Sequence, residues 1–189
     1  EFISCAEKLQ VGHPPGAPFY MMVGNLFTQF ASDPSQVSRT VNFLNALLSA
    51  GCILFLFWSI TRLVRSLLKE EKENLSVTDV IIILGSGLVG ALAYTFSDTF
   101  WFSAVEGEVY AFSSFLTALV FWMILRWQDE SDTVYGDRWI ILIAYIIGLS
   151  IGVHLLNLLC IPAIVLVFYY QKYRTISLKG AIAAIALSG

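Results

Sequence analysis

Three carboxylates stand close together between two apolar runs of this sequence. Asp98, Glu106 and Glu108 lie among Trp and Phe residues, and Tyr110 follows directly. Aromatic side chains gather at membrane–water interfaces, where carboxylates are costly and mark functional sites. Such acids could position a hydroxyl or a metal ion, or act as a general base; the alternative is that they are helix N-terminal charge. If the next helix begins near Glu106, this residue and Tyr110 share one helix face.

The two histidines of the chain are candidate phosphate-binding groups. His13 precedes a stretch with three prolines in five residues, which fixes the backbone around it. His154 stands alone in an apolar run, with Asn157 three residues further on. An imidazole ring can donate a hydrogen bond to phosphate whether it is neutral or protonated. The alternatives are a stiff connector at His13 and a hydrogen-bonded core histidine at His154.

The composition of the chain is typical of a membrane protein. Of its 189 residues, 57% are hydrophobic and 13% are charged, and the mean hydropathy is +0.74. Soluble domains are about 45–50% apolar and about 25% charged. This composition excludes a disordered tail or a small secreted disulfide scaffold, and together with the net charge of -3 it excludes a nucleic-acid partner. The three cysteines suggest no disulfide framework, and no Cys/His cluster has metal-ligand spacing, so no metal-ligating residue is predicted.

Long apolar runs predict a helix wherever they approach the roughly 20 residues that cross the hydrocarbon core. The longest, from 139 to 170, contains no charge and is too long for one span. We break it near residues 152–154, which places His154 at a hairpin tip. We expect an all-α polytopic integral membrane protein, present here as a fragment of a longer chain. The expected transmembrane bundle covers 41–189, with spans at about 41–61, 80–97, 108–126, 139–153 and 155–171 and the start of another at 181.

Residues 1–40 are expected to form a first outer loop that carries an amphipathic helix. This helix is too short and too polar to span, so it lies along the membrane surface or packs on other domains of the full protein. Its apolar residues recur at helical spacing, and they are Phe19, Met22, Val23, Leu26, Phe27 and Phe30.

Basic residues predict which side of the membrane each loop faces. Of the 11 Lys and Arg residues, two, Lys8 and Arg39, fall in the predicted outer segment. The other nine fall in three loops that we assign to the cytoplasm: Arg62, Arg65, Lys69, Lys72, Arg126, Arg138, Lys172, Arg174 and Lys179. The carboxylates and both histidines then face outward.

Two glycine patterns are interpreted as helix-packing positions. Residues 85–90 match the GxGxxG pattern of dinucleotide-binding loops, but that pattern requires a soluble strand–turn–helix and this run is an expected span. Gly148 and Gly152 form a GxxxG pair and receive the same interpretation. Residues 76–79, directly before the glycine-rich span, resemble a capping box.

Three stretches carry a resemblance to a known family. Residues 1–16, which include the His-Pro-Pro-Gly motif, residues 104–110 and residues 148–154 resemble a large bacterial family long described as a domain of unknown function. That family is similar to the animal transmembrane protein O-mannosyltransferases, within the C-type glycosyltransferase superfamily. The resemblance implies a helical bundle in a bacterial inner membrane, with a cavity that opens to the periplasmic face.

The resemblance also implies a chemistry. A sugar, expected to be mannose, would move from a polyprenyl-phosphate carrier to a protein hydroxyl. The partners would then be the lipid-linked donor, a protein acceptor and membrane lipids. The superfamily places its catalytic carboxylate in the first outer loop, where Glu1 and Glu7 are the acids of this chain. The resemblance therefore adds Glu1 to Glu106 and Glu108 as a catalytic candidate, and it defines neither a cofactor nor the role of a divalent metal.

Two other classes of function remain open at this point. A solute transporter or lipid flippase also places ionisable residues at membrane depth, but it should contain internal repeats with interrupted helices, and none is found here. A non-catalytic envelope scaffold would explain the high apolar content of the chain, but it would not explain why acids and histidines gather on one face.

Overall fold

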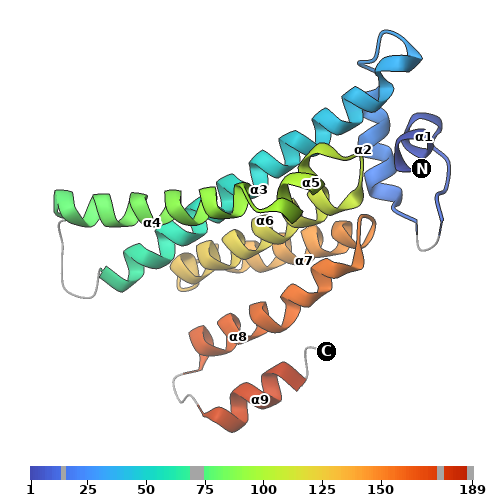
Figure 1. The fold of residues 1–189 in the computed structure, drawn as a ribbon. Helices are drawn as coiled ribbons and strands as arrows, with labels where there is room; N and C mark the ends of the chain where they lie inside the picture. Colours follow the sequence, from blue (N-terminus) through green and yellow to red (C-terminus); the bar gives the residue numbers. More distant parts are fainter. Residues whose placement is uncertain (14–15, 69–74, 174–176, 187–189) are drawn as a thin grey trace.

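The computed structural model describes residues 1–13, 16–68, 75–173 and 177–186, and every regular element within these ranges is a helix. This confirms the predicted all-α class. Figure 1 shows the arrangement of the helices. In chain order they are α1 (Phe2–Lys8), α2 (Pro18–Thr28), η1 (Pro34–Gln36), α3 (Val37–Leu68), α4 (Val77–Thr95), α5 (Asp98–Val105), α6 (Val109–Glu130), α7 (Asp137–Ile151), η2 (Leu155–Leu159), α8 (Cys160–Lys172) and α9 (Leu178–Ala186).

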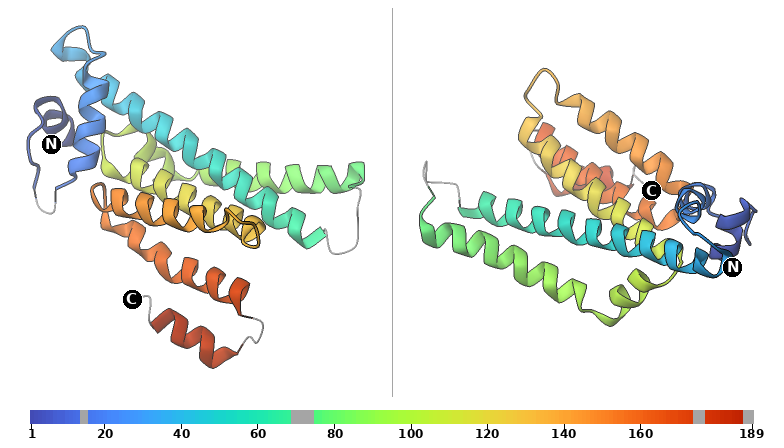
Figure 2. Two further views of the ribbon diagram at one scale, coloured as in Figure 1. Left: turned by 180° about the vertical axis from the view of Figure 1, so that it is seen from behind. Right: turned by 90° about the horizontal axis from the view of Figure 1, so that it is seen from above.

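The long helices run up and down beside one another (Figures 1 and 2). α3 packs against α4 and α6, and α6 packs in turn against α7 and α8. One end of the bundle, which we call the site end, carries α1, α2, α5 and the junction of α7 with η2. The opposite end, the arginine end, carries Arg62 and Arg126. This up-and-down arrangement brings segments far apart in sequence to one end of the molecule.

Four helices are long and apolar enough to cross a membrane, which supports the polytopic class. They are Pro34–Leu68, Val77–Thr95, Val109–Glu130 and Leu155–Lys172. α7 has 15 residues and overlaps the expected fourth span at 139–153, but it ends at Ile151 and is shorter than the four candidate spans. α3 has 32 residues and extends well beyond the expected span at 41–61. α4 begins with the predicted capping box, in which the Asp79 N–H donates to Ser76 Oγ at 3.1 Å and the Ser76 N–H donates to Asp79 Oδ2 at 2.9 Å.

The predicted glycine packing holds at some positions and not at others. A Cβ added to Gly87 would lie 2.5 Å from Thr61 Cγ2, and one added to Gly90 would lie 2.5 Å from Ile60 Cδ1, so α4 approaches α3 closely there. Gly85 and Gly148 have no described atom within 4 Å of such a Cβ. The packing interpretation is therefore wrong for Gly85 and Gly148, because both lie on helix faces that no described helix covers.

A hydrophobic cluster fastens the surface helices to the bundle at the site end. It combines Tyr20 from α2, Val41 from α3, Phe112 from α6 and Val153 from the α7–η2 junction. Tyr20 and Val41 are completely buried. Burying a large apolar side chain stabilises a fold by about 1.5–3 kcal/mol, so this cluster accounts for the fixed position of α2 against the bundle.

The amphipathic helix predicted in the first 40 residues is α2, and it has a second apolar face that the prediction did not include. Tyr20, Met21 and Gly24 are buried against α1 and the bundle, whereas Met22 and Leu26 are exposed. The predicted apolar stripe is present, but the helix is apolar on two sides. One side packs on protein, and the exposed side is suited to contact lipid.

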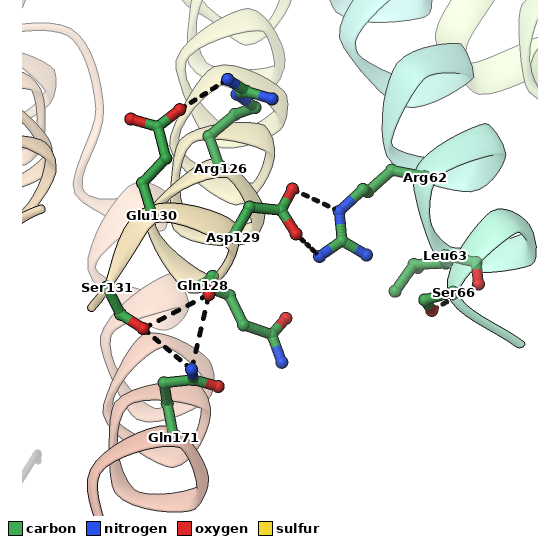
Figure 3. Close-up of polar contacts among 9 residues, drawn as sticks. All are labelled: Arg62, Leu63, Ser66, Arg126, Gln128, Asp129, Glu130, Ser131 and Gln171. Atoms are coloured by element: carbon green, nitrogen blue, oxygen red, sulfur yellow. Dashed lines mark hydrogen bonds and ion pairs between the residues drawn. The ribbon is translucent and has the colours of Figure 1, made fainter. Parts of the chain in front are cut away.

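Polar contacts hold the arginine end together (Figure 3). Arg62 from α3 binds both carboxylate oxygens of Asp129 on α6, with Nε 2.6 Å from Oδ2. Gln171 from α8 donates to Ser131 Oγ, which follows α6, at 2.8 Å. Bidentate charge-assisted pairs are the stronger kind of polar contact. The bundle is thus fixed at the end opposite the candidate site as well.

Candidate active site

Glu1 and His13 are brought together by a reversal of the chain after α1. Leu9 adopts the left-handed conformation, with φ 48° and ψ 42°, and ends the helix. The His13 backbone N–H then donates to Glu1 Oε1 at 2.6 Å, and His13 Nδ1 lies 2.7 Å from Glu1 Oε2. These hydrogen bonds, the backbone one first, hold the pKa of Glu1 below its usual value. His13 is therefore held by an ionised carboxylate on its Nδ1 side.

The start of α2 is fastened to the end of α7, and this carries the histidine-bearing loop to the bundle. The Phe19 N–H donates to the Gly152 carbonyl at 2.8 Å. A Cβ added to Gly152 would lie 2.9 Å from Phe19 Cβ, which is closer than real Cβ atoms approach. The predicted helix break falls here, since α7 ends at Ile151 and the chain turns into η2. Gly152 thus allows two backbones to meet next to His154.

His154 is the N-cap residue of η2, and its Nδ1 accepts a hydrogen bond from the Leu156 N–H at 3.1 Å. In the neutral ring the proton therefore lies on Nε2, which leaves that atom as a donor. The His154 ring centroid lies 5.5 Å from that of Tyr110. A pocket of about 490 Å³, the His13 pocket, brings together five of the residues discussed so far: His13, Glu108, Tyr110, Gly152 and His154.

A second pocket lies beside α5 and holds the acids. This α5 pocket has a volume of about 820 Å³, and Asp98, Glu106, Glu108 and Tyr110 all line it. Glu108 and Tyr110 line both this pocket and the His13 pocket. The expectation that Glu106 and Tyr110 share a helix face is wrong, because α6 begins only at Val109 and Glu106 is in extended conformation. The pocket, rather than a helix face, brings the two together.

An apolar pocket of about 530 Å³ lies deeper, between α3, α6 and α8. It shares Tyr94 and Ser114 with the α5 pocket. Asn157 lies in this deeper region, where it is buried and its Oδ1 accepts hydrogen bonds from the Ser113 and Thr117 hydroxyls. The structure thus places Asn157 at the contact of η2 with α6, away from the two pockets at the site end.

The charges at the site end are mostly negative. Glu1, Asp98, Glu106 and Glu108 gather there, and the basic residues of the two N-terminal helices and the start of α3 are Lys8 and Arg39. In the described ranges, no group of three or more His, Cys, Asp or Glu side chains is arranged to hold a metal ion. The hydrogen-bond donors placed to meet an anion in the His13 pocket are the two imidazoles and the Tyr110 hydroxyl. The arrangement can therefore take a proton from a hydroxyl on one side and bind a phosphate on the other.

Comparison with known proteins places the chain in a family. Residues 1–177 match the family model described as the protein O-mannosyl-transferase TMEM260 N-terminal domain. The chain belongs to this family. The resemblance inferred from the His-Pro-Pro-Gly loop and the acidic stretch is thereby confirmed for the animal enzymes.

Two relatives of the TMEM260 N-terminal domain family cover most of the chain. Protein O-mannosyl-transferase TMEM260 of Mus musculus is 26% identical over 183 residues, which is 94% of this chain and 23% of the mouse protein. The protein of the same name from Dictyostelium discoideum is 22% identical over 177 residues, 90% of this chain and 19% of its own length. The chain thus spans about a fifth of the length of these relatives. No solved structure matches it.

Two residues around the candidate site of this chain were not identified from the sequence. Asn45 and Tyr20 are completely buried and hydrogen-bonded to each other. The available signal was an amide in the apolar run that forms α3, which also contains Asn42. A buried amide requires partners, but the sequence does not name them.

Gly152 offers a direct test of how the His13 pocket is assembled. Gly152→Ala is expected to lower the free energy of unfolding of the full-length protein by about 1–3 kcal/mol, which is the usual effect of overpacking. The added Cβ would meet Phe19. Gly148→Ala is the matched control, since open space surrounds that position and alanine favours a helix. Thermal unfolding in detergent measures both variants. Equal behaviour of the two would show that the α2–α7 contact is not tight.

Proposed function

We propose that this chain is the N-terminal membrane part of a protein O-mannosyltransferase that takes mannose from a polyprenyl-phosphate carrier. The observation that carries the proposal is that the three pockets adjoin one another through shared lining residues. The apolar pocket shares Tyr94 and Ser114 with the α5 pocket, which shares Glu108 and Tyr110 with the His13 pocket. A ligand with an apolar tail and a phosphorylated sugar head has its apolar and polar parts in the same order as these pockets. The relatives' names supply the sugar and the protein acceptor.

The isoprenoid chain is assigned to the apolar pocket between α3, α6 and α8. Its lining includes Leu56, Val120, Phe121 and Ile164, and although several hydroxyl side chains also line it, the surface that it exposes is almost entirely apolar. Binding sites for apolar ligands are concave and lined mostly by hydrophobic side chains. Each CH₂ group taken out of water contributes about 0.8 kcal/mol. A long carrier would therefore bind more tightly here than a short one when both are presented from solution.

The transfer step is assigned to the site end. A carboxylate, Glu108 or Glu106, takes the proton of the acceptor hydroxyl, and the hydroxyl oxygen forms a bond to the sugar's anomeric carbon as the bond from that carbon to the phosphate oxygen breaks. The phosphate leaves on the carrier with both bonding electrons. Hydrogen bonds from His13 and His154 stabilise its growing charge. Carboxylates and imidazoles have separate tasks in this scheme, which fits their places in two adjoining pockets.

The site end is assigned to the periplasmic face of a bacterial inner membrane. The orientation is supported by the basic residues of the opposite end, among them Arg62, Arg126 and Lys172, since loops rich in Lys and Arg stay in the cytoplasm. The bacterial setting rests on the resemblance of the sequence. Both assignments locate the acceptor protein outside the cytoplasm.

The test compares donors with the purified full-length protein. Transfer of labelled mannose to protein is expected from a polyprenyl-phosphate donor and not from a nucleotide-activated mannose. Ala118→Trp, which fills the apolar pocket, is expected to raise the half-saturating concentration of a long-chain donor roughly tenfold, the equivalent of about two CH₂ contacts. A two-isoprene donor should be affected less.

The matched control is Val89→Trp on the exposed face of α4. It is expected to leave the dependence on donor concentration unchanged. Transfer from the nucleotide-activated sugar alone, or the same response of long and short donors to Ala118→Trp, would contradict the proposal. Movement of unmodified lipid across vesicles without sugar transfer would point to a flippase instead.

A further inference from the structure

The bend between α5 and α6 carries Glu106 and Glu108, the two candidate bases of the proposed transfer step. A side chain of α3 contacts the backbone of this bend. We propose that Asn45 is the positioning residue for Glu106 and Glu108, and that Tyr20 couples this arrangement to the docking of α2. The inference rests on the proposed transferase function, and no sequence pattern identified this pair. It is carried by four hydrogen bonds and by the packing around the bend.

Asn45 is a completely buried amide in a membrane-spanning helix. Its Nδ2 group donates one hydrogen bond to the Glu106 carbonyl and another, of 2.8 Å, to the Glu108 carbonyl. Both amide hydrogens are therefore used on the same bend. A flipped amide would direct its oxygen at two carbonyl oxygens, so only this orientation fits. A polar group buried at this depth is costly unless it is satisfied, and the bend provides its partners.

The bend itself is tight and enclosed. The Glu108 N–H donates to the Glu106 carbonyl at 2.9 Å, which closes a three-residue turn. A Cβ added to Gly107 would lie 2.7 Å from Ile3 Cγ1 of α1 and 3.1 Å from Asn42 Oδ1 of α3. Because the two carbonyls point to Asn45 and the middle residue is packed on both sides, the directions of the two glutamate side chains are set. Both side chains line the α5 pocket.

Tyr20 extends this arrangement to α2. Its hydroxyl donates to Asn45 Oδ1 at 3.3 Å, and its ring packs edge-on against Phe2, with centroids 5.8 Å apart. Burial raises the pKa of the Tyr20 hydroxyl, so it remains a donor at any physiological pH. α2 also contacts Gly152 next to His154. A displacement of α2 would therefore disturb the acids and the histidine-lined pocket together.

The first test is Asn45→Asp in the full-length protein. The acid has the same shape but can donate at most one hydrogen bond where the amide donates two, so the bend loses support. We expect kcat for mannose transfer to fall about 100-fold, which is the effect that misplacing a catalytic group by about 1 Å can have. The half-saturating donor concentration should change little. Tyr20→Phe removes only the hydroxyl and is expected to lower kcat severalfold, which keeps the test available if Asn45→Asp does not fold.

A double-mutant cycle separates positioning from general stability. In a Glu108→Gln background, Asn45→Asp should lower kcat by much less than in the wild type, because its effect runs through Glu108. Additive losses would overturn the inference. Ser49→Ala is the matched control: it removes a buried hydroxyl one turn further along α3 that has no hydrogen-bond partner among the described residues, and kcat should not change.

Hydrogen–deuterium exchange tests the same contact without activity. Backbone amides of residues 104–110 should exchange faster in Asn45→Asp than in the wild type or Ser49→Ala. If the wild type transfers no mannose, the proposed function fails. The exchange rates of residues 104–110 in Asn45→Asp and in the wild type then still show whether Asn45 holds the bend. If the wild type is active and Asn45→Asp changes neither kcat nor exchange, only the positioning inference fails.

Discussion

Glu108→Gln is expected to abolish nearly all mannose transfer by the full-length protein, with kcat lowered about 100- to 10,000-fold, the range that general bases contribute. Glu108 lines both pockets at the site end, so in the proposed transfer step it is the carboxylate between the acceptor and the carrier phosphate. It is also the N-cap residue of α6, yet its side chain makes no capping hydrogen bond with the described residues. The carboxylate is therefore not used to cap the helix.

Glu106→Gln is expected to have a smaller effect, about tenfold, because Glu106 lines the α5 pocket but not the His13 pocket and adds to the local negative field. Glutamine keeps the size of the side chain and removes its charge in both variants. Initial rates with saturating polyprenyl-phosphate mannose measure the effects. Asp33→Asn is a suitable control, since Asp33 is an exposed acid before α3 whose carboxylate caps η1. Full activity of both glutamine variants would show that the two acids serve only as negative charge near the start of α6.

The helices at the centre of the fold could be predicted because each expected span is a long apolar run with polar ends. The break at residues 152–154 was also predictable, since a glycine followed by a capping side chain interrupts a charge-free run that is too long for one span. α7 ends at Ile151 and His154 caps η2. Here local chemistry alone determines where the helix stops.

α5 could not be predicted. It has eight residues of mixed aromatic and hydroxyl character with no clear period, and it falls between the expected spans at 80–97 and 108–126. Its order comes from tertiary packing: Phe100 is buried, and its ring lies 4.4 Å from that of Tyr94 on α4. Tertiary contacts of this kind override local propensity.

The candidate site was predictable only in part, because its position also depends on tertiary contacts. The sequence indicates which side chains are chemically unusual, and His13, Glu108, Tyr110 and His154 do line one pocket. It does not indicate which residues hold them in place. Asn45 contacts the backbone 61 and 63 residues away, and neither a composition nor a spacing rule connects positions at that separation.

His154→Asn is expected to weaken donor binding without loss of stability, and this separates two roles of the histidine. Its Nδ1 accepts the Leu156 N–H and so caps η2; asparagine is a favoured N-cap residue and preserves that bond. What the substitution removes is the imidazole Nε2 donor, which shares a pocket with His13 and Tyr110. A hydrogen bond to a charged group is worth about 1.5–3 kcal/mol, so the half-saturating donor concentration should rise about 10- to 100-fold.

His154→Ala removes the cap as well as the donor, so it should weaken donor binding similarly and also lower the unfolding temperature. His13→Ala should weaken donor binding in the same way, because its ring lines the same pocket while Glu1 occupies its Nδ1 side. Combining His13→Ala with His154→Asn should weaken binding by less than the product of the two single effects if both rings contact one phosphate. If His154→Asn leaves the donor dependence unchanged and only the alanine variant loses stability, His154 serves as the cap of η2, and the phosphate must be bound elsewhere.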